Sequence, residues 1–331
     1  MKIKYNSDIQ LEKWKQFSSE NQFASPFQTP GYYNLYNSFN HLSAEVIAVE
    51  NTEGKIKALV VITIQKEKGV KGCFSKRGII YGGPLLTDLD SSKHLIDSIT
   101  KRYQKKLIYL EIRNFFDFNK YESIFNAWTF SEHLNVQLNI EEISDLESYL
   151  KLLKYNRRRE IKQSLKNDAI YNECKTKEDL EIIYKILQEL YHERVKLPLP
   201  TFDFFEKMLN NVNFIIFKVE HGNKIIGGAI CTYLDKKKIY TLFYCGLRNY
   251  DKKIFPTHLA VLATIDFGLR TNLSEVDFMG AGKPNKEYGV RDYKLKFGGN
   301  LVNHGRYILV LDKKRYKIGE FGIKMLAKIK K

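Results

Sequence analysis

The sequence predicts a mixed α/β (α+β) chain of two similar domains, each with a largely antiparallel sheet flanked by helices. The order helix, antiparallel strands, helix, strand occurs twice along the chain. A length of 331 residues, 44% of them hydrophobic, is enough for two hydrophobic cores. We therefore predict an N-terminal domain over residues 1–140 and a C-terminal domain over residues 141–310.

The first half contains the first copy of this plan. Its predicted elements are helices over residues 8–20 and 30–39, strands over 44–50, 56–65 and 78–81, a helix over 91–105 and a strand over 107–113. A turn containing Gly54 joins two of the strands into a hairpin. Another strand ends at Gly82-Gly83-Pro84, and Arg113 ends the last one.

The second half repeats the plan. Its predicted elements are a helix over residues 178–194, strands over 214–220, 225–234 and 239–245, a helix over 256–270 and a strand over 275–279. Leu180, Ile183 and Leu187 have the three-to-four spacing of an amphipathic helix. This order of elements resembles that of a GNAT N-acyltransferase domain, so the chain is expected to contain two GNAT-like domains in tandem.

Composition limits the compartment and the partners. The formal charge of +16 favours polyanionic partners such as tRNA, nucleotide diphosphates or anionic lipid headgroups. The alternative is that a Lys-, Asn- and Ile-rich composition reflects an AT-rich genome. The four cysteines form no Cys-x-x-Cys pair, which argues against a metal site and against a redox dithiol. The sequence has no signal peptide and no apolar run of about 20 residues, which predicts a cytoplasmic protein.

The strongest functional signal runs from Asp277 to Gly299. A strand ends at Gly280-x-Gly282, where the backbone can turn sharply and a ligand can approach closely. Cationic side chains follow within a short span: Lys283, Lys286, Arg291, Lys294 and Lys296. Such a segment is suited to binding phosphate or carboxylate and to stabilising the oxyanion of acyl transfer. The alternative is a solvated basic loop.

A second basic cluster extends from Asn156 through three arginines to Lys162. Arg158 and Lys162 are four residues apart and share one helix face. Like charges at that spacing repel each other, so an anionic partner such as a diphosphate is expected. The alternative is a solvated charged face.

These motifs together resemble the Fem family of aminoacyl-tRNA-dependent peptidyltransferases. Tyr293-Lys294-x-x-Phe297-Gly298 is similar to the family's aromatic-Lys-x-x-Phe-Gly pattern, which places its site lysine on Lys294. The segment 156–162 resembles the family's basic helix, and 78–84 resembles its Gly-Gly-Pro turn. The stretch that begins at Phe243-Tyr244 is also similar to the family's C-terminal domain.

The resemblance implies an acyltransferase that moves an aminoacyl group from aminoacyl-tRNA to an amine of a peptidoglycan or surface-glycan precursor. No resident cofactor, metal or DNA partner is expected. Lys294 would stabilise the acyl donor or the oxyanion, and Asp277 would orient the amine or act as base, unless it is a strand-end cap. The candidate substrate-binding residues are Asn156, Arg158, Lys162, Gly82, Gly83, Arg113, Tyr244, Gly280, Lys283, Arg291 and Lys296. Arg158 and Lys294 are expected to share one crevice.

Two alternatives remain open. One is an acyl-CoA-dependent GNAT N-acetyltransferase that acts on a sugar-nucleotide or lipid-linked amine. In such enzymes the pyrophosphate of acyl-CoA lies in a glycine-rich loop at a helix N-terminus. Here the corresponding stretch, 247–256, contains no glycine, which favours the tRNA-linked donor. The other alternative is a non-catalytic RNA- or membrane-binding protein. The basic tail, 311–331, is expected either to contact anionic lipid or tRNA or to pack on the first domain.

Overall fold

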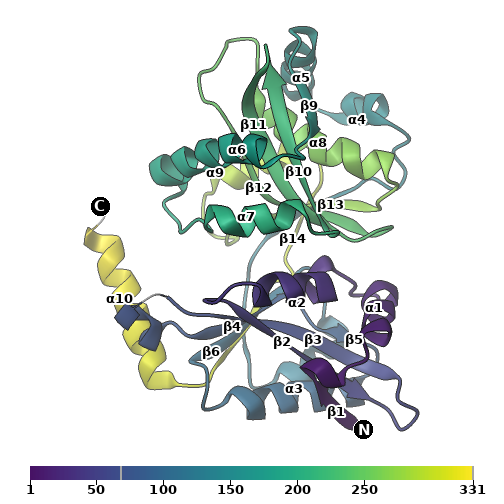
Figure 1. The fold of residues 1–331 in the computed structure, drawn as a ribbon, viewed down its shortest axis with the longest axis vertical. Coiled ribbons are helices and arrows are strands. Elements are labelled where there is room, and N and C mark those ends of the chain that lie inside the picture. Colours follow the sequence, from purple (N-terminus) through teal and green to yellow (C-terminus); the bar gives the residue numbers. More distant parts are fainter. Residues whose placement is uncertain (68, 330–331) are drawn as a thin grey trace. The chain divides into compact units, whose positions relative to one another are not determined.

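The computed structural model describes residues 1–67 and 69–329, and it divides into two compact units. One consists of Met1–His133 with Asn303–Lys331, and the other of Leu134–Val302. Each unit is built on a mixed sheet with helices on both faces (Figure 1). The predicted fold class is therefore confirmed.

The first unit contains both ends of the chain. Its elements are β1 (Lys2–Tyr5), α1 (Leu11–Glu20), α2 (Pro30–Asn37), β2 (Ser43–Glu50), β3 (Ile56–Gln65), β4 (Arg77–Gly82), β5 (Leu85–Leu86), α3 (Leu89–Tyr103), β6 (Tyr109–Asn114), β7 (Thr129–Ser131), β15 (Arg306–Val310) and α10 (Lys313–Ile329). The strand order is β1-β2-β3-β4-β6-β15-β7, and β5 pairs with β3. Helices α1 and α2 cover one face of this sheet and α3 covers the other (Figure 1).

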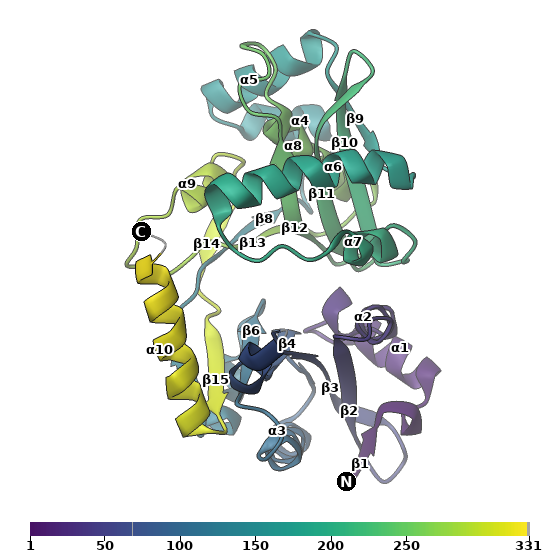
Figure 2. The same cartoon turned by 60° about the vertical axis from the view of Figure 1, so that its left-hand side comes forward.

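The second unit is a continuous segment of the chain. Its elements are β8 (Asn135–Asn139), α4 (Leu146–Leu152), α5 (Tyr155–Lys166), β9 (Ile170–Glu173), α6 (Lys177–Leu190), α7 (Phe202–Leu209), β10 (Phe214–His221), β11 (Lys224–Tyr233), β12 (Lys238–Gly246), α8 (Pro256–Arg270), β13 (Glu275–Gly280), α9 (Gly289–Leu295) and β14 (Asn300–Val302). The strand order is β14-β8-β13-β12-β11-β10-β9. Helices α6 and α7 lie on one face and α8 on the other (Figures 1 and 2).

Both units follow the same plan. In each, an antiparallel three-stranded meander leads through a crossover helix to a strand that pairs in parallel with the third strand of the meander. These parallel pairs are β4 with β6, joined through α3, and β12 with β13, joined through α8. A parallel pair requires such a crossover, because a tight turn can join only antiparallel neighbours.

Each sheet is completed by short strands that are distant in sequence from its meander. Strand β8 pairs with β13 and β14, so the second unit begins several residues before the predicted boundary at 140. Strand β15 pairs with β6 and β7, so the first unit regains the chain from Asn303, before the predicted boundary at 310. The chain therefore passes between the units twice.

Among the described residues, no helix combines the length and the apolar character that a membrane span requires.

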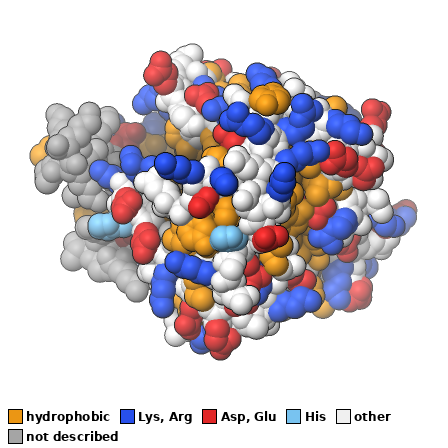
Figure 3. Space-filling view, turned by 90° about the horizontal axis from the view of Figure 1, so that it is seen from above, with side chains coloured by type: hydrophobic (Ala, Val, Ile, Leu, Met, Phe, Trp, Pro, Cys, Tyr) orange, Lys and Arg blue, Asp and Glu red, His pale blue; other side chains and the backbone are white. Residues whose placement is uncertain are grey.

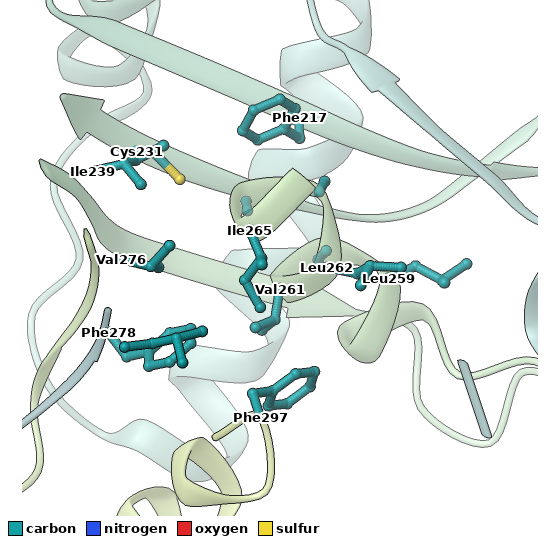
Figure 4. Packing of buried hydrophobic residues seen from close by; sticks show 14 of the residues in the cluster. Phe217, Cys231, Ile239, Leu259, Val261, Leu262, Ile265, Val276, Phe278 and Phe297 are labelled. Carbon is teal, nitrogen blue, oxygen red and sulfur yellow. The ribbon is translucent and has the colours of Figure 1, made fainter. Parts of the chain in front are cut away.

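Helix α8 forms the centre of the second unit's core. Its sequence is apolar on nearly every side, as expected for a helix that packs against a sheet while other elements cover it. Pro256 occupies the first turn, where its missing N–H costs no hydrogen bond. Figure 4 shows Phe217 and Phe297 at opposite ends of the cluster, with Ile265 and Val261 between them. This packing fixes the start of α8 and the end of α9 relative to the sheet.

The Gly-Gly-Pro turn between β4 and β5 requires both glycines. Gly82 and Gly83 have φ of +81° and +88°, where side chains are strained. A Cβ on Gly83 would lie 2.5 Å from the Phe118 ring, and one on Gly82 would lie 2.8 Å from Ser25 Oγ. Close packing within the first unit therefore accounts for this motif.

Replacing Gly83 with Ala is expected to destabilise the first unit by about 1–3 kcal/mol, because the methyl group meets a buried ring and the backbone is strained. Gly322→Ala, where no atom of the described residues lies within 4 Å of the new methyl group, is the control and should not destabilise the protein, because alanine is favoured over glycine in a helix. Urea unfolding followed by circular dichroism measures both. Equal midpoints for the two variants would contradict this account.

Candidate functional site

The parallel strands β12 and β13 separate toward their carboxyl ends. Pairing joins Lys238–Tyr240 to Glu275–Asp277, and no further pair joins the two strands in the described part of the chain. β12 continues to Gly246 beside β11, whereas β13 keeps its pairing with β8 on the other side and shifts register there after Asp277. In open α/β sheets, ligands bind at the carboxyl ends of strands that diverge in this way. We therefore take this opening as the candidate site.

Two buried charged groups hold the end of β13. The Asp277 carboxylate is fully buried and accepts hydrogen bonds from Gln137 Nε2 (3.0 Å) and the Met279 amide (2.6 Å). Lys294, on α9, is 6% exposed and donates from Nζ to the carbonyl oxygens of Met279 (3.3 Å) and Gly280 (2.8 Å). Met279 has φ of +63°, a strained value for a residue with a side chain. Both predicted catalytic residues therefore stabilise an irregular turn.

Burial shifts the pKa of each group toward its neutral form. Burial raises the pKa of Asp277, although the bonds from Gln137 and Met279 oppose the shift. Burial lowers the pKa of Lys294 to about 8, and the negative charge of Asp277 partly offsets it. An ammonium group has three protons, and two of them go to the Met279 and Gly280 carbonyls. The third has no partner among the described residues.

Arg157, one residue before the predicted Arg158, packs against the same helix α9. It is 5% exposed, and its guanidinium lies over the rings of Tyr293 (5.0 Å) and Phe297 (4.5 Å). Arg157 Nη1 is 3.5 Å from Glu160 Oε2. Stacking and this ion pair make burial of the charge tolerable. Successive helical residues point about 100° apart, which is why Arg157 is buried and Arg158 is not.

His258 connects α8 to helices α5 and α9. Its Nδ1 is 3.1 Å from the Tyr293 hydroxyl, and its Nε2 is 3.2 Å from Glu160 Oε2. Burial, followed by the positive charge of Arg157, lowers the pKa of His258 to about 3, so the ring is neutral. Burial raises the pKa of Tyr293 well above its usual range. The protonated hydroxyl therefore donates to Nδ1 and Nε2–H donates to Glu160. Nothing in the sequence places these three residues together.

Tyrosines gather beside the opening. Tyr244, on β12, stacks on Tyr293 with ring centroids 5.8 Å apart. Burial raises the pKa of Tyr244, and the phenols of Tyr288 and Tyr191 raise it further. Tyr191 begins a π-helical turn that ends at Val195, and such turns are frequent at functional sites. The sequence singled out Tyr244, whereas Tyr288 was not selected from the segment that contains it and Tyr191 carried no recognisable signal.

The other predicted residues of this unit lie in two places. Arg291 donates to the carbonyls of Ala281 (2.9 Å) and Lys283, so it holds the glycine-rich loop, while the Lys283 and Lys296 side chains are exposed. Arg158 and Lys162 line a hollow of about 690 Å³ along α5, beside exposed Asn156. Arg158 Nη1 donates to the Lys151 carbonyl (3.3 Å), and Lys162 pairs with Glu147 at 2.7 Å.

Lys294 does not line the α5 hollow. The expected convergence of Arg158 with Lys294 is therefore not seen there, because Arg157 is the arginine of this cluster that faces α9. Gly82, Gly83 and Arg113 belong to the first unit. No group of three or more His, Cys, Asp or Glu residues in the described ranges is arranged to hold a metal ion.

Comparison with solved structures identifies proteins of similar architecture. No family model matches the sequence, and no curated protein matches it. The crystal structure of FemX matches 96% of this chain and 99% of its own with a TM-score of 0.77, at 12% identity. The chain has the fold of FemX. The Fem-like and tandem GNAT-like fold expected from the motifs is thus confirmed.

Other matches share this FemX-like fold more distantly. L-PGS from Bacillus licheniformis matches 94% of the chain and 96% of its own with a TM-score of 0.59, at 12% identity. A tandem GNAT protein from the clavulanic acid biosynthesis pathway matches 94% and 99% with a TM-score of 0.55, at 8% identity. Such identities show a shared fold, so the chemistry of the chain has to be argued from its own residues.

Arg157→Ala is expected to destabilise the protein by about 2–4 kcal/mol, because it leaves Glu160 without its cation and removes the stacking on Tyr293 and Phe297. The matched control is Arg159→Ala, two residues further along α5, whose exposed side chain should contribute within about 0.5 kcal/mol. Urea midpoints measure the difference. A larger loss in the Arg159 variant would refute the assignment.

Proposed function

We propose that this protein is an acyltransferase that moves an aminoacyl group from aminoacyl-tRNA to an amine of a peptidoglycan or surface-glycan precursor. The observation that carries the proposal is Lys294: within a FemX-like fold, it lies at the open end of β12 and β13 with one ammonium proton unpartnered in the described residues. The Fem-like motif around Lys294 supports the same conclusion.

The chemistry requires few groups. The acceptor amine attacks the ester carbonyl of the donor, an amide forms, and the ester C–O bond breaks. The proton lost by the amine passes to the departing ribose oxygen, so no cofactor is consumed. A negative charge develops on the carbonyl oxygen, and in this proposal the remaining N–H of Lys294 stabilises it. Asp277 is fully buried and holds Met279, so its role is to position this turn rather than to act as base.

The surface charge supports polyanionic substrates. The formal charge is +16, and Figure 3 shows Lys and Arg side chains spread over one face among acidic and apolar ones. Arg158 and Lys162, in the α5 hollow, are our candidates for the phosphates of the acceptor. Membrane contact through α10 would fit a lipid-linked acceptor.

The start of α8 favours aminoacyl-tRNA over acyl-CoA. Residues 247–256 lack the glycines of a pyrophosphate cradle. Gly246 also packs closely on the first turn, because a Cβ there would lie 2.5 Å from the Thr257 amide nitrogen.

One observation supports an acyl-CoA donor as the second candidate. A hollow of about 250 Å³ adjoins the start of α8 and is lined by residues 247–251 and 254–258. The experiment that separates the donors incubates the full chain with a UDP-linked muropeptide and either aminoacyl-tRNA or acetyl-CoA, followed by mass spectrometry. Transfer from the tRNA alone supports the proposal. Transfer from acetyl-CoA alone, with CoA binding in calorimetry, would replace it by the second candidate, and no product from either would remove both.

Lys294→Met should lower turnover about tenfold or more, because one stabilising donor is lost from the transition state. Lys185→Met, at an exposed position on α6, is the control and should turn over normally. Circular dichroism checks that both variants are folded. A folded Lys294 variant with unchanged turnover would exclude this lysine from the reaction.

Turnover should also fall as pH rises through about 8. The Lys294 ammonium keeps its proton below its lowered pKa of about 8 and loses it above, so the charged donor disappears on the alkaline side. Lys294→Arg retains a charged donor far above this range and should remove the alkaline fall, whatever its absolute rate. An unchanged fall in the Arg variant would assign it to another group.

A further inference from the structure

The first sheet carries a cluster of charged residues that the proposed acyl transfer does not use. Arg113, on β6, and Arg306, on β15, are directly opposite partners in the sheet. Both donate to one carboxylate: Arg113 Nη2 to Glu111 Oε2 at 3.1 Å, and Arg306 Nη1 to Glu111 Oε1 at 2.8 Å. Sequence reasoning found Arg113 alone, because Arg306 follows almost two hundred residues later.

This cluster has more positive than negative charge. Glu111 is buried, and the two guanidinium groups lower its pKa, so it carries a full negative charge against two positive ones. Arg306 Nη2 is 2.9 Å from His133 Nε2, and since a guanidinium only donates, this nitrogen accepts and the ring is neutral. Burial, followed by the positive charge of Arg113, lowers the pKa of Arg306, and the second cause is expected for like charges held close together.

Donors of the two arginines remain available. Arg113 stacks on Tyr81, with its guanidinium carbon 5.2 Å from the ring centroid, and its buried Nε has no hydrogen-bond partner among the described residues. The side chains of Arg113 and Arg306 are 31% and 28% exposed, so both can be reached from solvent.

We infer that this face of the first unit binds an oxyanion, a phosphate or carboxylate group of a ligand, between Arg113 and Arg306. A planar guanidinium presents a fork of N–H donors that fits both anions. Glu111 orients the two forks and leaves one positive charge for the ligand, and the Tyr81 ring holds the Arg113 plane. The inference does not depend on the proposed acyl transfer.

The test observes the arginines directly. The full chain labelled with ¹⁵N-arginine is titrated with sodium phosphate and, separately, with sodium acetate at constant ionic strength, and the Nε–Hε resonances are followed. Arg113→Gln and Arg306→Gln assign the two signals. Saturable shifts of both with phosphate alone identify a phosphate site, and shifts with acetate identify a carboxylate site. No saturable shift with either anion would overturn the inference.

Two variants separate an anion site from a purely structural ion-pair cluster. Arg113→Gln should weaken anion binding about tenfold or more, as expected for losing a charge-assisted pair. Glu111→Gln should tighten it several-fold, because the competing carboxylate is removed while both arginines stay. The control is Arg102→Gln in the same unit, whose partner is Glu45, and it should bind anions as the parent does. If Glu111 served only to hold a structural cluster together, its replacement would disorder the two arginines and could not tighten anion binding. Weaker binding in a folded Glu111 variant would therefore contradict the proposed site.

Discussion

The end of β13 depends on two charged side chains that are almost completely buried. Asp277 and Lys294 approach the same turn from β13 and α9, and each bonds to groups of Met279 or Gly280. Burying a charge is tolerable only when hydrogen bonds replace its hydration, and both groups obtain such bonds from backbone and from Gln137. The strained Met279 persists because these bonds over-determine it. The opening between β12 and β13 is therefore a rigid feature of the fold.

The same architecture holds two different sets of charged residues. Strands β6 and β13 are equivalent, since each follows a crossover helix, pairs in parallel with the meander and is flanked by an antiparallel strand from elsewhere in the chain. In the second unit this neighbour, β8, supplies Gln137 to a buried carboxylate. In the first unit it is β15, which supplies Arg306 to a cationic cluster. The side chains thus differ at corresponding places while the strand arrangement is shared.

Long, strongly patterned elements could be predicted from the sequence. The predicted bounds of α8 and β3 match the structure, because Pro256 marks the helix start and the apolar residues of both elements stay buried. The strands β7, β8, β14 and β15 are three to five residues long and were not predicted. Their stability comes from pairing with distant segments, so local pattern holds little information about them. The domain boundaries shifted for the same reason.

The sequence by itself determined the fold class, the repeated order of elements and the choice of Lys294 as a candidate site residue. Periodicity, turn residues and a short motif are local properties, and these predictions rest on them. Only the tertiary structure decided that Arg157 rather than Arg158 packs on α9, that His258 joins Tyr293 to Glu160, and that Arg306 returns to Glu111. These contacts depend on side-chain direction and on strand pairing across long stretches of chain. These contacts form only when the whole core packs, so the residues next to each partner in the sequence do not predict them.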